Sequence, residues 1–133
     1  MRLVLAMAVA ASTAFGGVAY AQGDPVNGEK VFAKCKSCHM VGENAKTRVG
    51  PTLNGIAGQA WGVQDGFKYS PALKEMAASG RVWDDASLDA YLTKPKDVIP
   101  RGRMSFPGLN DAAQRADVIA YLKTFNADGS AKK

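Results

Sequence analysis

Histidine and cysteine are scarce in this chain, and their scarcity excludes several kinds of site. The 133 residues include one histidine, His39, and two cysteines, Cys35 and Cys38. A structural zinc site takes four ligands, mostly Cys and His, so these three side chains are too few to build one. Two cysteines also provide no separate disulfide framework for a small domain. Since the sequence shows no internal repeat and no convincing strand alternation, we expect neither a repeat architecture nor a sheet.

The three scarce residues lie together in the segment Cys35-Lys36-Ser37-Cys38-His39. Cys-x-x-Cys-His is the attachment motif of a c-type haem. Two thiols three positions apart lie on one face of a helical turn, where both can add to the vinyl groups of one porphyrin. The histidine that follows is then carried under the ring as an iron ligand. The alternative is a thiol–disulfide redox pair, which also uses Cys-x-x-Cys, although no thioredoxin-like strand pattern surrounds these cysteines.

The second axial ligand of such an iron has to be another residue type, because His39 is the only histidine. Met40 adjoins His39 and cannot reach the opposite face of the haem. Met76 falls within a short helical pattern, where a methionine more often fills core space. Met104 lies in a segment broken by proline and glycine, which can lay a thioether across a haem face. We therefore predict His39 and Met104 as the axial ligands; a gap-filling role for Met104 is the alternative.

Residues 1–21 have the three parts of a secretory signal peptide. Arg2 supplies the positive charge, residues 3–11 are apolar, and Ala19-Tyr20-Ala21 fits the small-x-small rule for cleavage. A membrane anchor is the alternative, but the apolar run is short for a span of about 20 residues. We expect cleavage after Ala21, a periplasmic location, and a single domain formed by residues 22–133.

The net charge of +5 is unevenly placed along the chain. Basic residues gather around the haem motif and in a second run between residues 94 and 103. The six that we predict to form a docking face are Lys34, Lys36, Lys46, Lys94, Lys96 and Arg103. An exported protein rarely meets nucleic acid, so we expect this positive face to bind acidic faces of protein partners. An ordinary solvated surface is the alternative.

Helix signals predict four helices between glycine-rich loops. Asp24-Pro25 begins a helix that is expected to run into the haem motif, and Ser70-Pro71 begins a second that Gly80 closes. A third begins at residue 84 or 85 and stops before Pro95. Asn110 is predicted to cap the last helix. The residues expected on the buried face of that helix are Val118, Ile119, Leu122 and Phe125.

Three segments are predicted to lack regular structure. Glycines recur throughout residues 41–66, which indicates irregular loops. Residues 94–108 contain three prolines and two glycines, so we expect no regular helix or central strand there. The tail, residues 127–133, is predicted to fray.

Several ordered motifs together resemble a class I c-type cytochrome of the small bacterial cytochrome c2 type, which is similar to mitochondrial cytochrome c. Residues 28–32 resemble the N-terminal helix of that family, and residues 48–55 resemble its loop under the proximal histidine. Residues 99–106 resemble its methionine loop, and residues 117–123 its C-terminal helix. The resemblance implies an all-α cytochrome c fold, in which four to five helices and long Gly/Pro loops wrap around one covalently bound haem c.

The same resemblance implies roles for particular residues. Cys35 and Cys38 would form the thioethers, and His39 and Met104 would be the axial ligands. The carbonyl of Pro51 would accept a hydrogen bond from His39. Three aromatic residues would also contact the haem or its ligand: Tyr69 and Trp83 by donating hydrogen bonds to the propionates, and Tyr91 by approaching the Met104 sulfur. Plain core packing is the alternative for these aromatic side chains.

Two further implications concern packing and departures from the family. Gly28 and Phe32 would pack against residues 121 and 122 where the terminal helices cross. Gln59 stands where mitochondrial relatives usually carry an arginine that contacts a propionate, and Gly102 replaces a common threonine.

The implied function is that of a one-electron carrier, not an enzyme. It would shuttle electrons between a membrane cytochrome bc complex and a photosynthetic reaction centre or terminal oxidase. We expect a monomer that touches the membrane surface only transiently. One alternative is a gas sensor or weak peroxidase, which needs a vacant or displaceable sixth ligand. Another is a thiol–disulfide oxidoreductase that uses Cys35 and Cys38.

Overall fold

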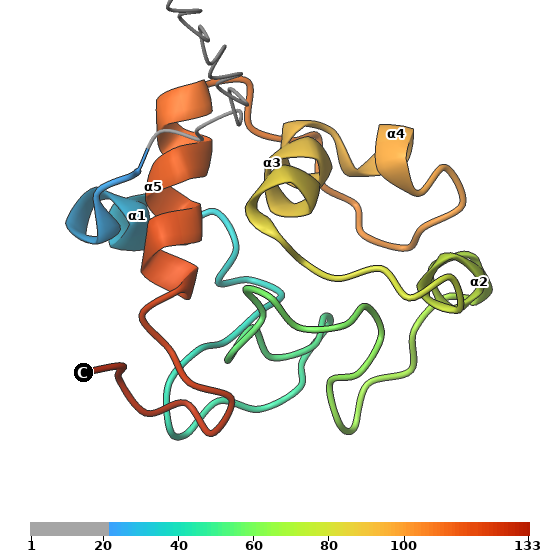
Figure 1. Ribbon diagram of the computed structural model, residues 1–133, viewed down its shortest axis with the longest axis horizontal. Helices are drawn as coiled ribbons and strands as arrows, with labels where there is room; N and C mark the ends of the chain where they lie inside the picture. The colour runs from blue at the N-terminus through green and yellow to red at the C-terminus, as the bar shows by residue number, and fades with distance from the viewer. Residues whose placement is uncertain (1–21) are drawn as a thin grey trace, which may run out of the picture.

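The computed structural model describes residues 22–133, so the predicted signal peptide lies outside the described residues. Within that range the chain forms helices joined by long loops, with β-structure limited to two isolated bridges. The helices are α1 (Pro25–Phe32), α2 (Pro71–Ala77), α3 (Asp85–Thr93), α4 (Pro95–Val98) and α5 (Ala112–Leu122). In Figure 1 α1 and α5 cross on one side of the molecule, and α3, α4 and α2 follow around the other side. The predicted all-α class is confirmed.

Side-chain caps explain where the helices begin. Asp24 Oδ1 accepts the N–H of Val26 at 2.8 Å, and Ser70 Oγ accepts the N–H of Leu73 at 3.1 Å. Asp84 caps α3 in the same way. These caps are the ones that the sequence predicts, because each acid or hydroxyl satisfies an N–H group that has no partner inside its helix.

The predicted cap of the last helix is wrong by one residue. Asp111, not Asn110, caps α5, and its Oδ1 lies 2.8 Å from the N–H of Ala113 and 3.4 Å from that of Gln114. Asn and Asp have nearly equal preferences for this position, so two neighbouring candidates cannot be separated by residue type alone.

Two helix boundaries also differ from the prediction. A short helix, α4, begins at Pro95, because proline at the first helical position has no N–H that needs a partner. The α-helix that begins at Pro25 ends at Phe32 and does not continue as α-helix into the haem motif. After Phe32 the backbone hydrogen bonds join residues three positions apart instead of four: the N–H of Cys35 donates to the carbonyl of Phe32 at 2.8 Å.

The predicted fraying of the tail is also wrong. Phe125 and Ala131 form an antiparallel bridge, and the N–H of Lys132 donates to the carbonyl of Thr124 at 2.8 Å. The backbone of residues 124–132 therefore has its own hydrogen bonds, which are expected to hold it against fraying.

The crossing of α1 and α5 organises one side of the core. Phe32 is 2% exposed, and its ring lies 5.5 Å from that of Tyr121. A Cβ at the buried Gly28 would overlap the carbonyl of Asp117 and lie 2.7 Å from Cβ of Tyr121. The two backbones therefore approach as closely as they do only because residue 28 has no side chain. The predicted contact between these helices is confirmed.

The rest of the core joins α3 and α5 to the loops. Val118, Ile119 and Leu122 are buried on α5 as predicted, whereas Phe125 lies beyond the end of the helix and is only half-buried. Ile99, at the end of α4, is 1% exposed. None of the helices among residues 22–133 is long and apolar enough to span a bilayer.

We expect Gly28→Ala to lower the free energy of unfolding by about 1–3 kcal/mol, because the added methyl group overpacks the helix crossing. Chemical denaturation of the purified protein, followed by circular dichroism, measures the change. Glu29→Ala, at the neighbouring exposed position, is the control and should change stability little. Equal stabilities for the two variants would mean that the crossing tolerates a side chain at residue 28.

Candidate functional site

The predicted attachment segment forms one helical turn after α1. The N–H groups of Cys38 and His39 both donate to the carbonyl of Cys35, at 3.1 and 2.9 Å. Both cysteines are half-buried. Burial raises the pKa of the Cys35 thiol more than the nearby Lys34 lowers it. Since thiol–disulfide exchange needs a thiolate, this environment disfavours the redox-pair alternative.

The imidazole of His39 is held from one side by a hydrogen bond. Its Nδ1 lies 2.7 Å from the carbonyl oxygen of Pro51, so Nδ1–H donates and Nε2 carries no proton. Burial lowers the pKa of His39, and the bond to Pro51 offsets only part of that effect. The ring is therefore neutral at physiological pH, with the unprotonated Nε2 available to bind a metal.

Gly50 lets the backbone lie flat against this ring. A Cβ at residue 50 would lie 2.8 Å from Nδ1 of His39 and 2.9 Å from its Nε2. Any side chain there would displace the imidazole. Gly50 lies in the predicted loop motif of residues 48–55, but this role was not predicted; its position directly before Pro51 was the available signal.

Backbone hydrogen bonds join the histidine segment to the loop that contains Pro51. The N–H of Gly50 donates to the carbonyl of Cys38 at 2.9 Å, and the N–H of Leu53 donates to the carbonyl of Met40 at 3.0 Å. Asn54, which is 6% exposed, completes the pairing with a side chain that bonds both polar groups of the Gly42 backbone, at 2.8 and 2.9 Å. Residues 38–42 and 50–54 therefore run side by side as one unit. Sequence reasoning missed the role of Asn54.

Two of the three predicted aromatic residues, Trp83 and Tyr91, lie in one stack, and Tyr69 lies apart from it. The ring of Trp83 lies between those of Trp61, stacked at 4.2 Å and 19°, and Tyr91, tilted at 5.1 Å. Tyr69 is nearly buried and accepts a hydrogen bond from the N–H of Gln64 at 3.1 Å, which leaves its own O–H free to donate. Trp61 was not singled out from the sequence, because its contact with Trp83 spans 22 positions.

Two buried polar atoms near this stack have no hydrogen-bond partner among the described residues. They are Nε1 of Trp61 and Oε1 of Gln59. Buried polar groups are almost always satisfied, and Gln59 stands at the position where the resemblance places a propionate contact. An indole N–H is a suitable donor to a carboxylate, so Trp61 fits a haem propionate, whereas the amide oxygen of Gln59 can only accept a hydrogen bond.

The two candidate methionines occupy different environments. Met76, on α2, packs against the hydrophobic core as expected, whereas Met104 is half-buried and lies outside that cluster. The loop that carries Met104 is fixed by bonds from the N–H of Gly102 to Ile99 O, at 2.9 Å, and from Lys96 Nζ to Gly102 O, at 2.8 Å. In Figure 1 this loop and the segment after α1 face the middle of the molecule from opposite sides.

All six predicted docking residues are exposed, and the structure places them on two segments. Three follow α1: Lys34, Lys36 and Lys46. The other three are near α4: Lys94, Lys96 and Arg103. Lys34 bonds Gln114 at 3.0 Å, and Lys94 pairs with Asp97 at 3.5 Å, so the second group is partly neutralised.

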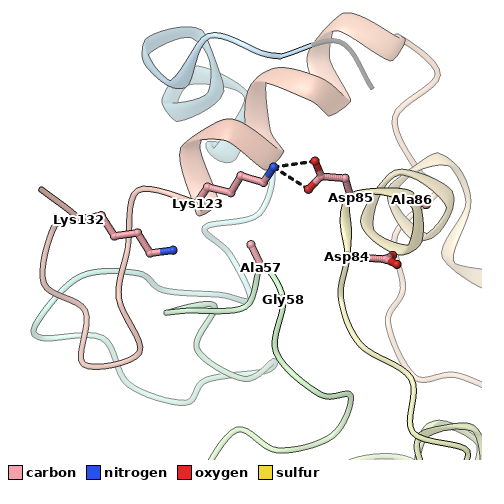
Figure 2. Close-up of a pocket in the computed structure, with 7 residues that line it drawn as sticks. All are labelled: Ala57, Gly58, Asp84, Asp85, Ala86, Lys123 and Lys132. Atoms are coloured by element: carbon pink, nitrogen blue, oxygen red, sulfur yellow. Dashed lines mark hydrogen bonds and ion pairs between the residues drawn. The ribbon is translucent and has the colours of Figure 1, made fainter. Parts of the chain in front are cut away.

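A surface hollow lies apart from all of these residues. Figure 2 shows it between the loop at Ala57 and Gly58, the start of α3 and the end of α5. Lys123 Nζ lies 2.6 Å from one carboxylate oxygen of Asp85 and 2.7 Å from the other, which ties α5 to α3. None of the predicted site residues lines this hollow.

Comparison with known proteins gives consistent matches over most of the chain. The model of the cytochrome c family matches residues 25–126. Cytochrome c2 of Rhodomicrobium vannielii is 48% identical over 124 residues, which are 93% of this chain and 97% of that protein. Cytochrome c-550 of Ancylobacter novellus is 51% identical over 106 residues, 80% of this chain and 99% of that protein. The solved structure of cytochrome c2 from Rhodospirillum centenum has a TM-score of 0.74 and 36% identity, covering 78% of this chain and 99% of that one.

Tyr91 gives the site a pH dependence that stability measurements can isolate. Burial raises its pKa from 10.0 to about 12. The phenol ionises at a lower pH in the unfolded chain than in the folded protein. Its contribution to the free energy of unfolding is therefore complete below pH 10 and is lost as the pH rises towards 12. We expect Tyr91→Phe to remove this part of the alkaline loss, as measured by denaturation at pH 9 to about 12. Parallel stability profiles for the two proteins would contradict the burial of the Tyr91 hydroxyl.

Proposed function

Because the chain belongs to the cytochrome c family, we propose that it is a periplasmic one-electron carrier with a haem held by Cys35, Cys38, His39 and Met104. Proteins of this family carry one covalently attached haem c and act in electron transport, not as enzymes. When bound, the haem supplies an iron that alternates between the ferric and ferrous states.

The observation that carries the proposal is the 2.7 Å contact between His39 Nδ1 and the Pro51 carbonyl. It fixes the tautomer and the orientation of the ring and leaves Nε2 as the ligand atom. The helical turn at Cys35 places both thiols and His39 on the same segment, as thioether attachment needs. Gly50 lies against the imidazole, and a side chain at this residue would overlap the ring.

On the opposite face we propose Met104 as the ligand. Its loop is anchored by hydrogen bonds at Gly102, and its side chain is not part of the core cluster. A thioether ligand raises the reduction potential. With His39 and Met104 both holding the iron, little bonding would change on electron transfer and no small molecule would reach the iron.

Carbon monoxide tests the closed site. We expect the visible spectrum of the reduced protein to be low-spin and unchanged by the gas, because Met104 occupies the sixth position. Met104→Ala should bind carbon monoxide, whereas the control Met76→Ala, in a core methionine, should not. A wild-type spectrum that shifts with the gas would indicate an open iron and favour a sensor or peroxidase. Absence of haem would return the two cysteines to thiol chemistry.

For partners we propose the acidic faces of membrane redox proteins: a cytochrome bc complex as donor, and a reaction centre or terminal oxidase as acceptor. Support comes from six exposed basic side chains on the two segments that border the attachment site and the Met104 loop. Such electrostatic contacts speed the encounter with a partner and allow the complex to dissociate quickly, as a shuttle needs.

Residues 1–21 are proposed as a cleaved leader, and residues 22–133 as a monomeric single domain.

Charge reversal tests this docking face. We expect Lys34→Glu and Lys94→Glu to slow electron transfer to an acidic redox partner by about tenfold at low salt, and less at high salt, because screening weakens steering. Stopped-flow absorbance measures the rate. Lys74→Glu, on α2, makes the same change in net charge outside the predicted face and should have a smaller effect. Equal slowing by all three variants would indicate a dependence on net charge alone.

A further inference from the structure

The last residues of the chain form a closed structure that we call the C-terminal hook, residues 124–132. The N–H of Asn126 donates to the carbonyl of Ser130 at 2.8 Å, and the N–H of Gly129 donates to the carbonyl of Asn126 at 2.9 Å. Side chains reinforce the turn: Asn126 Nδ2 donates to Ser130 Oγ at 3.0 Å, and Asp128 Oδ1 accepts from both the N–H and the hydroxyl of Ser130, at 2.9 and 2.7 Å. The hook is therefore shaped by its own bonds.

The hook lies in direct contact with the loop unit that holds His39. Gly129 is buried, and a Cβ at this residue would overlap the carbonyl of Gly42 and lie 2.7 Å from the N–H nitrogen of Glu43. After the second paired segment, a Cβ at Gly55 would lie 2.8 Å from Cα of Ala127. These are backbone-to-backbone contacts, so neither side can yield by turning a side chain.

Gly42 is the last residue of the first paired segment described above, and Gly55 directly follows the last residue of the second. Asn54 joins Gly42 to residue 54, Leu53 bonds Met40, and Gly50 bonds Cys38. The same pairing places the Pro51 carbonyl against Nδ1 of His39. A short and continuous set of hydrogen bonds thus connects the surface covered by the hook to the imidazole.

We infer that the C-terminal hook is a positioning element for His39: by packing on residues 42, 43 and 55 it keeps the paired segments in register, and thereby keeps the Pro51 carbonyl on Nδ1. The inference rests on the proposed role of His39 as an iron ligand. Among the described residues no hydrogen bond joins the hook to the imidazole or to the predicted attachment cysteines, so it would act through the loop unit. Closely packed segments transmit such a constraint because their arrangements are discrete.

Two glycines provide a matched pair of substitutions. Gly129 has φ +85° and Gly80, after α2, has φ +80°, so alanine meets similar backbone strain at both positions. At Gly129 the added Cβ would overlap the Gly42 backbone, whereas at Gly80 it would meet no atom within 4 Å. The difference between the two variants therefore isolates the contact between hook and loop.

The measurement is hydrogen exchange of the His39 ring N–H by NMR in the reduced, haem-loaded protein. We expect Gly129→Ala to speed this exchange by about tenfold, because a shifted loop opens the bond to Pro51 more often. Gly80→Ala should leave it unchanged. The equilibrium constant for reduction should also rise about threefold in Gly129→Ala only, since a weaker bond to Pro51 makes the imidazole a poorer electron donor.

Ser130→Ala is the second variant, in case Gly129→Ala does not fold. It removes the hydroxyl that bonds Asn126 and Asp128 but adds no atom, and it should speed exchange in the same direction. If both hook variants keep the wild-type exchange rate and potential while haem and His39 ligation are intact, the hook is only a stabilising element and the inference is wrong. A low-spin spectrum unchanged by His39→Ala would instead refute the proposed ligand, which is a separate failure.

Discussion

The hydrogen bond between His39 and the Pro51 carbonyl is the contact on which the site depends. It decides which imidazole nitrogen keeps its proton, and it can do so only if the loop that carries Pro51 is fixed relative to the turn that carries His39. No regular sheet or helix fixes that loop. It is fixed by Gly50, whose missing side chain admits the ring, and by Asn54, whose amide replaces the backbone pairs that a strand would supply.

The helices contribute to the site indirectly, by anchoring the segments that carry its residues. The crossing at Gly28 holds α1 against α5, and the cysteine turn starts directly where α1 ends. On the other side, the Met104 loop begins where the short α4 ends, after α3, and Ile99 is buried at the start of this loop. Two loops that face the middle of the molecule from opposite sides (Figure 1) are thus each anchored to a packed helix. Irregular segments of this kind keep one conformation only when their ends and backbone groups are satisfied.

The sequence predicted the features that depend on neighbouring residues. Asp24, Ser70 and Asp84 begin helices because a cap and its helix are local, and the attachment motif lies within five residues. Contacts between distant segments were missed. Trp61 against Trp83, Asn54 against Gly42 and the hook against Gly42 join positions that carry no local pattern. The errors at Asn110 and Pro95 are of another kind, because two caps of equal preference stood side by side and a proline can begin a helix as well as interrupt one.

With His39 and Met104 as the proposed ligands, rigidity in the loops would be a functional requirement as well as a structural one. A carrier exchanges electrons fastest when little moves, so the imidazole and the thioether would have to keep the same places in both oxidation states. The imidazole is constrained directly, by the Pro51 carbonyl on Nδ1 and by the Gly50 backbone beside the ring. The methionine is constrained less directly, through hydrogen bonds at Gly102 two residues earlier. The asymmetry implies that, of the two proposed ligands, Met104 would be the easier to detach, because fewer contacts oppose its movement.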